Sequence, residues 1–308
     1  MSPSNANTPV LRTVGLRKRF GAQVAVDGID MEIPAGVIAG FVGPNGSGKT
    51  TTIRMLLALV TPTSGRAEVL GSPTDRPGDY LPRVGALIEG PAFYPSLSGR
   101  RNLEVLATLG GIPHERVDTV LQLVELTERA GDKVRSYSLG MKQRLGIAGA
   151  LLPQPELLIL DEPGNGLDPA GILELRRLLA RLRDQGITIF ISSHLLSEVE
   201  QMADWIIVLK SGRLLFQGAM SDLLARRRGR LLVATEDARG LATVVGIAAS
   251  AGHAAARVNG HVEIDAPPLF AAELNRRAMN AGVTLVEITH AQASLDETFL
   301  DMTAGEVR

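Results

Sequence analysis

Residues Gly43 to Thr50, GPNGSGKT, form a glycine-rich segment with the pattern G-x-x-x-x-G-K-[ST]. The segment stands between a strand-like run, VIAGFV, and a helical pattern, TTIRMLLALV. Glycines in such a loop let backbone N–H groups converge on phosphate oxygens, and the helix start adds the positive end of its dipole. We therefore predict a phosphate-binding loop in which Lys49 neutralises the β- and γ-phosphates of a nucleotide, while the Thr50 hydroxyl ligates Mg²⁺.

A second apolar run, LLIL at residues 157–160, ends in the adjacent carboxylates Asp161 and Glu162. On a buried strand these acids emerge at the carboxyl end, where open α/β sheets bind ligands. Asp161 is then placed to hold Mg²⁺, and Glu162 to orient or deprotonate an attacking water. An acid pair after a strand is weak by itself, but beside a phosphate loop it predicts a nucleotide-hydrolysing site.

These motifs need a scaffold that brings strand ends together. From about Val10 to Gly218, apolar strand-like runs alternate with helical patterns, which predicts an α/β fold with a mostly parallel sheet covered on both faces. The alternation breaks after Gly85, and we predict an inserted helical subdomain at about residues 88–150. Residues 219–230 are predicted to form a helical linker.

The linker ends in a basic run of four arginines, Arg226, Arg227, Arg228 and Arg230, which we interpret as a solvated helix end. Residues 231–308 then repeat strand and helix patterns in the order β-α-β-β-α-β, which resembles a small ferredoxin-like α+β unit. A last helix is predicted from Ser294 to Met302. At the other end, residues 1–9 are interpreted as a short disordered tail.

Composition excludes several classes of protein. The 308 residues are 45% hydrophobic, which suffices for roughly two domains, and they include no cysteine for disulfides or thiolate metal sites. The 32 basic and 33 acidic residues balance, so no net field favours nucleic acid or an anionic membrane. No apolar run approaches the roughly 18 residues of a membrane span, so we expect no membrane-spanning segment. Residues 1–9 lack the basic start and the apolar stretch of a secretory signal, and we therefore expect a cytoplasmic protein.

Together, these motifs resemble the ATP-binding subunit of an ATP-binding cassette (ABC) transporter over about Val10 to Gly218. The segment Tyr137 to Arg144, YSLGMKQR, lies just before a helical pattern and resembles the family's signature sequence. The resemblance implies that Ser138 and Gly140 complete the ATP site of the opposite subunit in a head-to-tail dimer. The signature is divergent, because leucine and methionine stand at 139 and 141 in place of the usual glycine and glutamine.

Further residues take roles from the same resemblance. Asp168 in GLD resembles the D-loop at the dimer interface, and His194 in ISSH resembles the switch histidine that contacts the γ-phosphate. Phe20 matches the aromatic residue that stacks on adenine, with a core position as the alternative. The predicted nucleotide-binding residues of the phosphate loop (Walker A motif) are Gly43, Pro44, Asn45, Gly46, Ser47, Gly48, Lys49, Thr50 and Thr51.

Glu89 departs from the family pattern, since most members have a glutamine that links the Mg²⁺ and water region to the transmembrane partner. Glutamate here resembles the lantibiotic- and bacitracin-type exporter branch, so Glu89 is a predicted nucleotide- and metal-site residue; a solvated loop acid is the alternative. Next to it, Phe93, Tyr94 and Leu97 form an apolar loop suited to a partner's helix. At the end of the chain, Ser294 to Leu300, SLDETFL, resembles a motif that closes many ABC-2 type exporter subunits.

The resemblance implies a cytoplasmic, membrane-associated ATPase that uses ATP and Mg²⁺, with Lys49, Glu162 and His194 as catalytic residues. It would drive a separate ABC-2 type permease at the cytoplasmic face of the plasma membrane and export a hydrophobic drug, antibiotic or peptide. Homodimer and heterodimer, the compound, the permease and the role of the C-terminal domain stay open.

Three other classes are less favoured. A soluble ABC ATPase acting on ribosomes or DNA would show tandem cassettes, a long coiled coil or a basic surface. A GTPase would need an [NT]-K-x-D segment, which the sequence does not contain. A non-catalytic scaffold would not need an intact Lys49, Asp161, Glu162 and His194.

Overall fold

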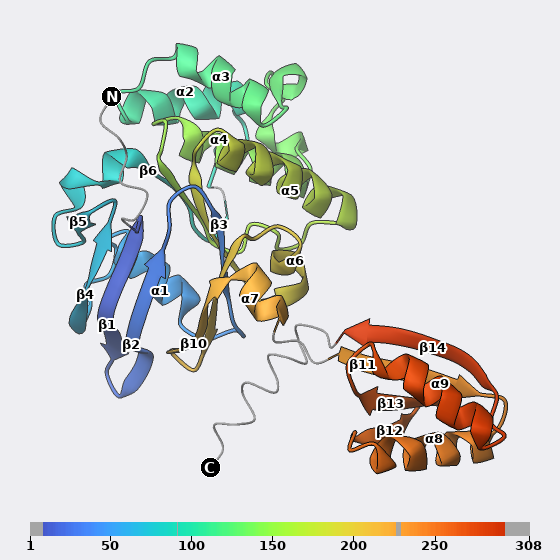
Figure 1. The fold of residues 1–308 in the computed structure, drawn as a ribbon. Coiled ribbons are helices and arrows are strands. Elements are labelled where there is room, and N and C mark those ends of the chain that lie inside the picture. Colours follow the sequence, from blue (N-terminus) through green and yellow to red (C-terminus); the bar gives the residue numbers. More distant parts are fainter. Residues whose placement is uncertain (1–8, 91, 226–228, 293–308) are drawn as a thin grey trace. The chain divides into compact units, whose positions relative to one another are not determined.

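A computed structural model describes residues 9–90, 92–225 and 229–292 of the chain (Figure 1). The chain divides into two compact units, Met1–Met220 and Ser221–Arg308. Four sequence predictions fall wholly or largely outside the described residues: the disordered tail, three of the four linker arginines, the last helix and the SLDETFL motif.

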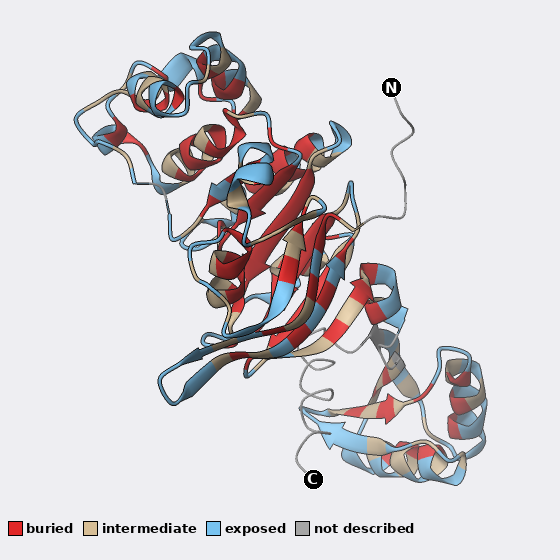
Figure 2. Ribbon diagram, turned by 90° about the vertical axis from the view of Figure 1, so that its left-hand side faces the viewer, coloured by how far each residue is buried: buried red, intermediate tan, exposed pale blue. Residues whose placement is uncertain are grey.

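The first unit is built on a six-stranded sheet with the strand order β10-β9-β3-β8-β7-β6. All neighbours in this sheet are parallel except β10, which is antiparallel to β9. Residues of β3, β7 and β8 are all buried (Figure 2), because both faces of the sheet are covered. The prediction of a mostly parallel sheet is therefore confirmed. The strands are β3 (Ile38–Val42), β6 (Val84–Leu87), β7 (Leu157–Leu160), β8 (Thr188–Ser193), β9 (Trp205–Lys210) and β10 (Arg213–Ala219).

Strand β3 illustrates how the two faces are covered. Ala39 and Phe41 belong to a core shared with helix α1, and the Phe41 ring lies 5.0 Å from the ring of Phe190 in β8. Gly40 faces the other way, where a Cβ atom would lie 2.0 Å from a side-chain carbon of Val199. Glycine at this position lets helix α6 pack directly on the strand that leads into the phosphate loop.

A separate antiparallel sheet, ordered β2-β1-β4-β5, was not expected from the sequence. Its strands are buried on one face only: in β1, for example, Leu11, Thr13 and Leu16 are buried and Arg12 is exposed. The buried face joins the core around α1. The strands are β1 (Leu11–Phe20), β2 (Gln23–Ile33), β4 (Ser64–Val69) and β5 (Ser72–Pro73).

Helices fill the interval between β6 and β7, within the region predicted to be a helical insertion. The loop before α2 is fixed by Asn102, whose side chain accepts a hydrogen bond from the Tyr94 N–H (2.8 Å) and donates one to the Ser98 carbonyl (2.9 Å). The α-helices of the first unit are α1 (Lys49–Leu56), α2 (Gly99–Leu109), α3 (Glu115–Leu123), α4 (Leu139–Leu151), α5 (Pro169–Asp184) and α6 (Leu196–Glu200). Short 3-10 turns are η1 (Pro77–Asp79), η2 (Leu81–Arg83), η3 (Thr127–Arg129) and η4 (Val134–Ser136).

The second unit has a four-stranded sheet of order β12-β13-β11-β14 in which every pair is antiparallel. Helices α8 and α9 pack with this sheet around its own hydrophobic core, which includes Val233, Val244, Ile264 and Leu274. The elements are β11 (Gly229–Thr235), α8 (Ala238–Ser250), β12 (Ala255–Val258), β13 (His261–Asp265), α9 (Phe270–Asn280) and β14 (Leu285–Gln292).

The predicted helical linker over residues 219–230 is too long. Helix α7 covers Met220–Ala225, and strand β11 already begins at Gly229. Because glycine is unfavourable inside a helix, Gly229 is a poor position for the predicted helix to continue. Arg230 lies in the strand, where its guanidinium is 3.5 Å from the carboxylate of Glu263 on β13. It is therefore part of a sheet and not of a solvated helix end.

Because each of the two units has its own hydrophobic core, we expect the two units to unfold in separate transitions. Replacing Ile264 with alanine is expected to destabilise the second unit by about 2–5 kcal/mol, because the side chain is fully buried. Calorimetry should show a lower melting temperature for the transition of that unit and no change for the first unit. The control is Val286→Ala, since this side chain is 64% exposed and its loss should cost less than about 0.5 kcal/mol. A common shift of both transitions would contradict independent cores.

Candidate active site

The predicted motifs meet at one edge of the six-stranded sheet. Strand β8 lies between β3 and β7, and all three are parallel. Their carboxyl ends therefore point the same way, and the loops that follow them are neighbours. The phosphate loop follows β3, the acid pair follows β7, and His194 follows β8.

The phosphate loop has the geometry that its glycines allow. Gly48 caps α1 with a φ of 103°, in the left-handed region that favours glycine. A Cβ atom there would also lie 2.5 Å from the carbonyl oxygen of Ala25, so no larger residue fits without movement. The loop thus reaches the start of α1 with its backbone close to β2.

Lys49 is nearly buried, with 6% of the residue exposed. Its ammonium group donates a hydrogen bond to the Gly43 carbonyl (2.7 Å) and lies 3.3 Å from the carboxylate of Glu162. A buried cation is thereby held against the loop and beside the second acid. This is where a phosphate-binding cation is needed.

Thr50 and Asp161 form the pair of oxygen ligands that the sequence predicts for Mg²⁺. The Thr50 hydroxyl donates to Asp161 Oδ2 over 2.9 Å, and Asp161 is 5% exposed. Magnesium takes hard oxygen ligands and commonly combines one or two protein carboxylates with phosphates and water, so this pair fits the ion. The described residues contain no cluster of three or more His, Asp or Glu that could hold a metal.

Glu162 sits between the two other predicted catalytic groups. One carboxylate oxygen lies 3.3 Å from the Lys49 ammonium, and the other is 2.7 Å from Nδ1 of His194. The His194 backbone N–H also donates to this second oxygen (3.3 Å). Because the Glu162 side chain is 20% exposed, it keeps access to solvent from this position. The arrangement suits a carboxylate that binds and activates a water molecule.

A pocket of about 360 Å³ opens beside these groups. Phe20 forms part of its wall and is 50% exposed, which does not fit a core aromatic; the Lys18 ammonium lies 4.9 Å from the ring centroid. The pocket is lined by Phe20, Gln23, Ala25, Asn45, Gly46, Ser47, Gly48, Lys49, Thr50, Thr51, Glu162 and Asn165.

Three lining residues, Gln23, Ala25 and Asn165, were not predicted from the sequence. Gln23 pairs with Phe20 across the β1–β2 turn, so the predicted position of the aromatic residue could have indicated it. Asn165 N–H donates to the Glu162 carbonyl (3.1 Å), a turn that directly follows the acid pair.

Ser192 of β8 also escaped the sequence analysis, although it contacts both acids. Its hydroxyl donates to Asp161 Oδ1 (2.5 Å) and accepts from the Glu162 N–H (2.9 Å). A polar residue at the end of the strand-like run ITIFIS was the available signal.

Eight predicted site residues do not line the pocket of their own chain. Four of them are hydrogen-bonded to residues that do, namely Gly43, Pro44, Asp161 and His194. The other four lie on other segments. Ser138 caps α4, accepting from the Met141 N–H (3.2 Å), and Gly140 lies in the first turn of that helix. Asp168 caps α5 by accepting from the Gly171 N–H (2.8 Å). The fourth residue, at position 89, lies after β6.

Glu89 was expected near the metal ligands, but its carboxylate forms an ion pair with Arg54 of α1. The Glu89 side chain is 64% exposed. The physical reason is proximity: β6 ends beside the last turn of α1, where Arg54 offers a charge partner. The acid therefore contacts the phosphate-loop helix and not the phosphate loop itself.

The signature segment is anchored by Tyr137. Its hydroxyl donates to the Arg129 carbonyl (2.7 Å), and burial, with a smaller contribution from Asp132, raises the pKa of this phenol. The hydroxyl therefore stays protonated at neutral pH and keeps its bond. This holds the chain just before the helix cap at Ser138.

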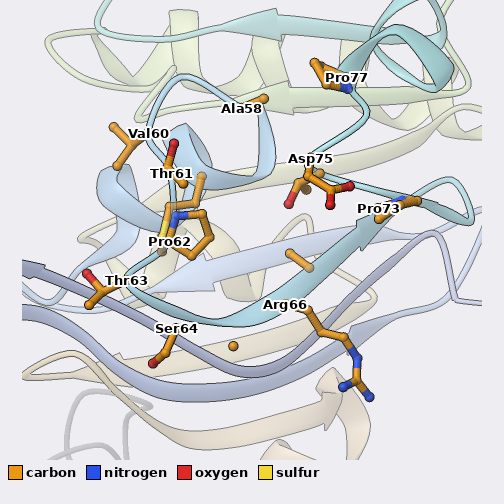
Figure 3. A pocket seen from close by; sticks show the side chains of 14 residues that line it. Ala58, Val60, Thr61, Pro62, Thr63, Ser64, Arg66, Pro73, Asp75 and Pro77 are labelled. Carbon is orange, nitrogen blue, oxygen red and sulfur yellow. The ribbon is translucent and has the colours of Figure 1, made fainter.

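A pocket of about 560 Å³ lies where the C-terminal end of α1 faces β4 and the segment before η1 (Figure 3). Among its described lining residues are three prolines, Pro62, Pro73 and Pro77, and one carboxylate, Asp75. None of the residues predicted to bind nucleotide lines this pocket. This pocket is larger than the one beside Lys49 and Glu162, so pocket size alone would not have identified the candidate active site.

A mostly parallel sheet with a glycine-rich phosphate loop between a strand and a helix is characteristic of the P-loop NTPases, and the chain has this fold. Residues 26–165 match the family described as ABC transporter. The chain belongs to the ABC transporter family, as an ATP-binding subunit that hydrolyses ATP.

Relatives and solved structures agree with this membership. The bacitracin transport ATP-binding protein BcrA of Bacillus licheniformis is 40% identical over 96% of this chain and 98% of its own length. The lantibiotic transport ATP-binding protein SrtF of Streptococcus pyogenes is 41% identical over 68% of this chain and 90% of its own. The structure of cbiO1 from Clostridium perfringens, part of the ABC transporter complex cbiONQ, has a TM-score of 0.66 and 29% identity, over 71% of this chain and 92% of its own.

Proposed function

We propose that this ATPase powers the export of a hydrophobic drug, antibiotic or peptide through a separate ABC-2 type membrane permease. The observation that carries the ATPase part of the proposal is the linked set of Lys49, Glu162 and His194 beside a pocket for a nucleotide. The similarity to a bacitracin transport protein over nearly the full chain supports an antibiotic peptide as the substrate class.

The proposed chemistry is ATP hydrolysis by positioning and charge neutralisation. Phe20 stacks on adenine, the phosphate-loop amides and Lys49 hold the phosphates, and Thr50 and Asp161 hold Mg²⁺. The ion, when bound, neutralises charge on the β- and γ-phosphates. Glu162 accepts a proton from the attacking water as its oxygen bonds to the γ-phosphorus and ADP leaves. Contact between His194 and Glu162 fixes the carboxylate and places the imidazole near the γ-phosphate.

Two subunits are proposed to form each ATP site. Ser138 and Gly140 lie at the start of α4, outside their own pocket, and a helix N-terminus carries free N–H groups for a phosphate. In a head-to-tail dimer these groups meet the γ-phosphate bound by the partner, and Asp168 lies at the same interface. Because one chain carries both halves of a site, a homodimer of this chain would hold two complete sites.

The domain roles follow the two units. We assign residues 10–218 to the ATP-binding domain, about 88–150 to a helical subdomain within it, and 231–308 to a ferredoxin-like accessory domain. The SrtF match covers 68% of this chain but 90% of that protein, whereas the BcrA match covers 96% of this chain. This difference in coverage supports an accessory domain that some relatives have in addition to the ATP-binding domain.

A groove of about 410 Å³ is the proposed docking site for a short helix of the permease. It lies between β6 and the inserted helices, and its lining is apolar. The described lining residues include Leu87, Ile88, Phe93, Leu106, Ile112 and Leu152. The groove continues from the loop that carries Glu89, so an apolar helix seated here would contact the segment that is ion-paired with α1.

No helix among the described residues is long and apolar enough to cross a membrane. We propose that the chain is held at the cytoplasmic face of the plasma membrane by the permease. Purification from the native membrane in mild detergent tests this: a stoichiometric polytopic protein should accompany the chain. Recovery alone, or with ribosomes or DNA, would contradict the transport role. ATP-dependent uptake of the antibiotic, without efflux, would contradict export.

Leu106→Asp is expected to abolish co-purification of the permease, because a charge would then enter the apolar groove that Leu106 lines. The side chain is 39% exposed, so the isolated subunit should fold and bind ATP normally. Leu109→Asp is the matched control, three residues along the same helix, 80% exposed and outside the groove. Equal permease recovery with both variants would exclude this groove as the docking site.

A further inference from the structure

Ser192 is a fully buried serine near the carboxyl end of β8. The two residues that precede it on the strand, Phe190 and Ile191, are apolar and buried. Buried hydroxyl groups need hydrogen-bond partners. Here both partners belong to the acid pair that follows the adjacent strand.

The hydroxyl fixes the carboxylate of Asp161. Ser192 donates to Asp161 Oδ1 (2.5 Å), while the Thr50 hydroxyl donates to Oδ2 (2.9 Å). With each oxygen bound from a different strand or helix, the carboxylate plane has a single orientation. Partners of this kind orient metal ligands and tune the affinity of the metal site.

The same hydroxyl holds the backbone of Glu162. This residue has a φ of 51°, in the left-handed region that non-glycine residues seldom adopt. Its N–H donates to Ser192 Oγ over 2.9 Å. The bend turns the side chain toward Lys49 and His194, so the bond from Ser192 stabilises the conformation that places the catalytic carboxylate.

Only a hydroxyl can serve both acids at once. A serine side chain has one donor hydrogen and two acceptor lone pairs. Ser192 uses the donor for Asp161 and an acceptor for Glu162. Strand pairing supplies the distance, because Leu160 pairs with Ile191 in the β7–β8 register and the next residues along each strand are the acid and the serine.

We propose that Ser192 is a positioning residue for ATP hydrolysis. Its hydroxyl orients Asp161 for Mg²⁺ and holds Glu162 in the bent conformation that aims its carboxylate at the attacking water. This inference rests on the roles of Asp161 and Glu162 in the proposed function.

Ser193 provides a matched control one residue further along. Its hydroxyl accepts from the Leu195 N–H (3.0 Å), a local bond in the turn after β8. It has no hydrogen bond to either acid in the described structure. Removing this hydroxyl should therefore change the strand end without changing the acids.

The test uses the purified full chain with five single substitutions: Ser192→Ala, Ser192→Val, Ser192→Thr, Ser193→Ala and Glu162→Gln. The measurements are kcat, KM for ATP, the Mg²⁺ concentration for half-maximal hydrolysis, and the affinity for a fluorescent ATP analogue without Mg²⁺. Valine and threonine have nearly the same shape and differ in the hydroxyl. The valine and threonine variants therefore still test the role of the hydroxyl if the alanine variant does not fold.

Ser192→Ala and Ser192→Val are expected to lower kcat and to raise the half-maximal Mg²⁺ concentration, each by about 10–100-fold, the usual effect of losing a group that orients a metal ligand. Affinity for the analogue without Mg²⁺ should stay within about twofold of wild type, since Ser192 does not line the pocket. Ser192→Thr should keep most of the activity, and Ser193→Ala all of it.

Unchanged kcat and Mg²⁺ dependence in the alanine and valine variants would overturn the proposal. So would equal losses in the threonine and valine variants, or a loss of analogue affinity as large as the loss of kcat, because either result indicates a packing role. Normal turnover by Glu162→Gln would instead contradict the proposed function, so the two failures are distinguishable.

Discussion

Glu162→Gln is expected to lower ATP hydrolysis by about 10²–10⁴-fold, the usual contribution of a general base. Glutamine keeps the shape and can still accept a hydrogen bond from His194 Nδ1, which lies 2.7 Å from the carboxylate. An amide oxygen cannot take a proton from water at neutral pH. MgATP binding should therefore persist, and the dimer should be trapped with nucleotide bound.

Steady-state phosphate release, equilibrium binding of ATP and size-exclusion chromatography with MgATP measure these three effects. The control is Glu128→Gln, an exposed glutamate of η3 outside the nucleotide pocket. Turnover close to wild type in the Glu162 variant would remove this residue from the role of base. Loss of ATP binding would instead indicate that the carboxylate mainly holds Lys49.

Unlike Glu162→Gln, Lys49→Met is expected to weaken ATP binding itself as well as hydrolysis. The ammonium group is almost fully buried beside the phosphate loop. Hydrogen bonds to charged groups contribute about 1.5–3 kcal/mol each. Loss of contacts to two phosphates should therefore weaken MgATP binding by about 10²-fold or more, and hydrolysis should become undetectable.

Isothermal titration calorimetry with MgATP measures this loss directly. Lys133→Met removes an exposed lysine of the same chain, outside the pocket, and should bind as the wild type does. Tight ATP binding by the Lys49 variant would contradict the assignment of the phosphate loop. Circular dichroism separates this result from misfolding, since Glu162 loses the Lys49 ammonium as a charge partner in this variant.

The strands that carry the site were predictable because their signals are local. β3 and β7 are continuous apolar runs, and each is followed directly by residues of distinctive chemistry, the glycine loop and the acid pair. The phosphate-loop residues predicted from the sequence all line the pocket except Gly43 and Pro44, whose carbonyls accept from Lys49 instead.

Other features depend on contacts between distant segments. The role of Ser192 follows from the pairing of β7 with β8, which no local pattern specifies. The partner of Glu89 is Arg54, 35 residues earlier, and no local pattern around Glu89 indicates this pair. The antiparallel sheet was likewise missed because its strands pair outside the alternating α/β pattern.

The Arg54–Glu89 ion pair makes a short connection between the phosphate-loop helix and the loop that carries Glu89. Helix α1 has eight residues and is about 12 Å long. Its first turn carries Lys49 and Thr50, and its last turn is ion-paired with the loop beside the groove that we propose for the permease. A displacement of α1 as a rigid body reaches this loop through one helix and one ion pair. We therefore expect the phosphate loop and the proposed docking groove to be coupled through this one short helix.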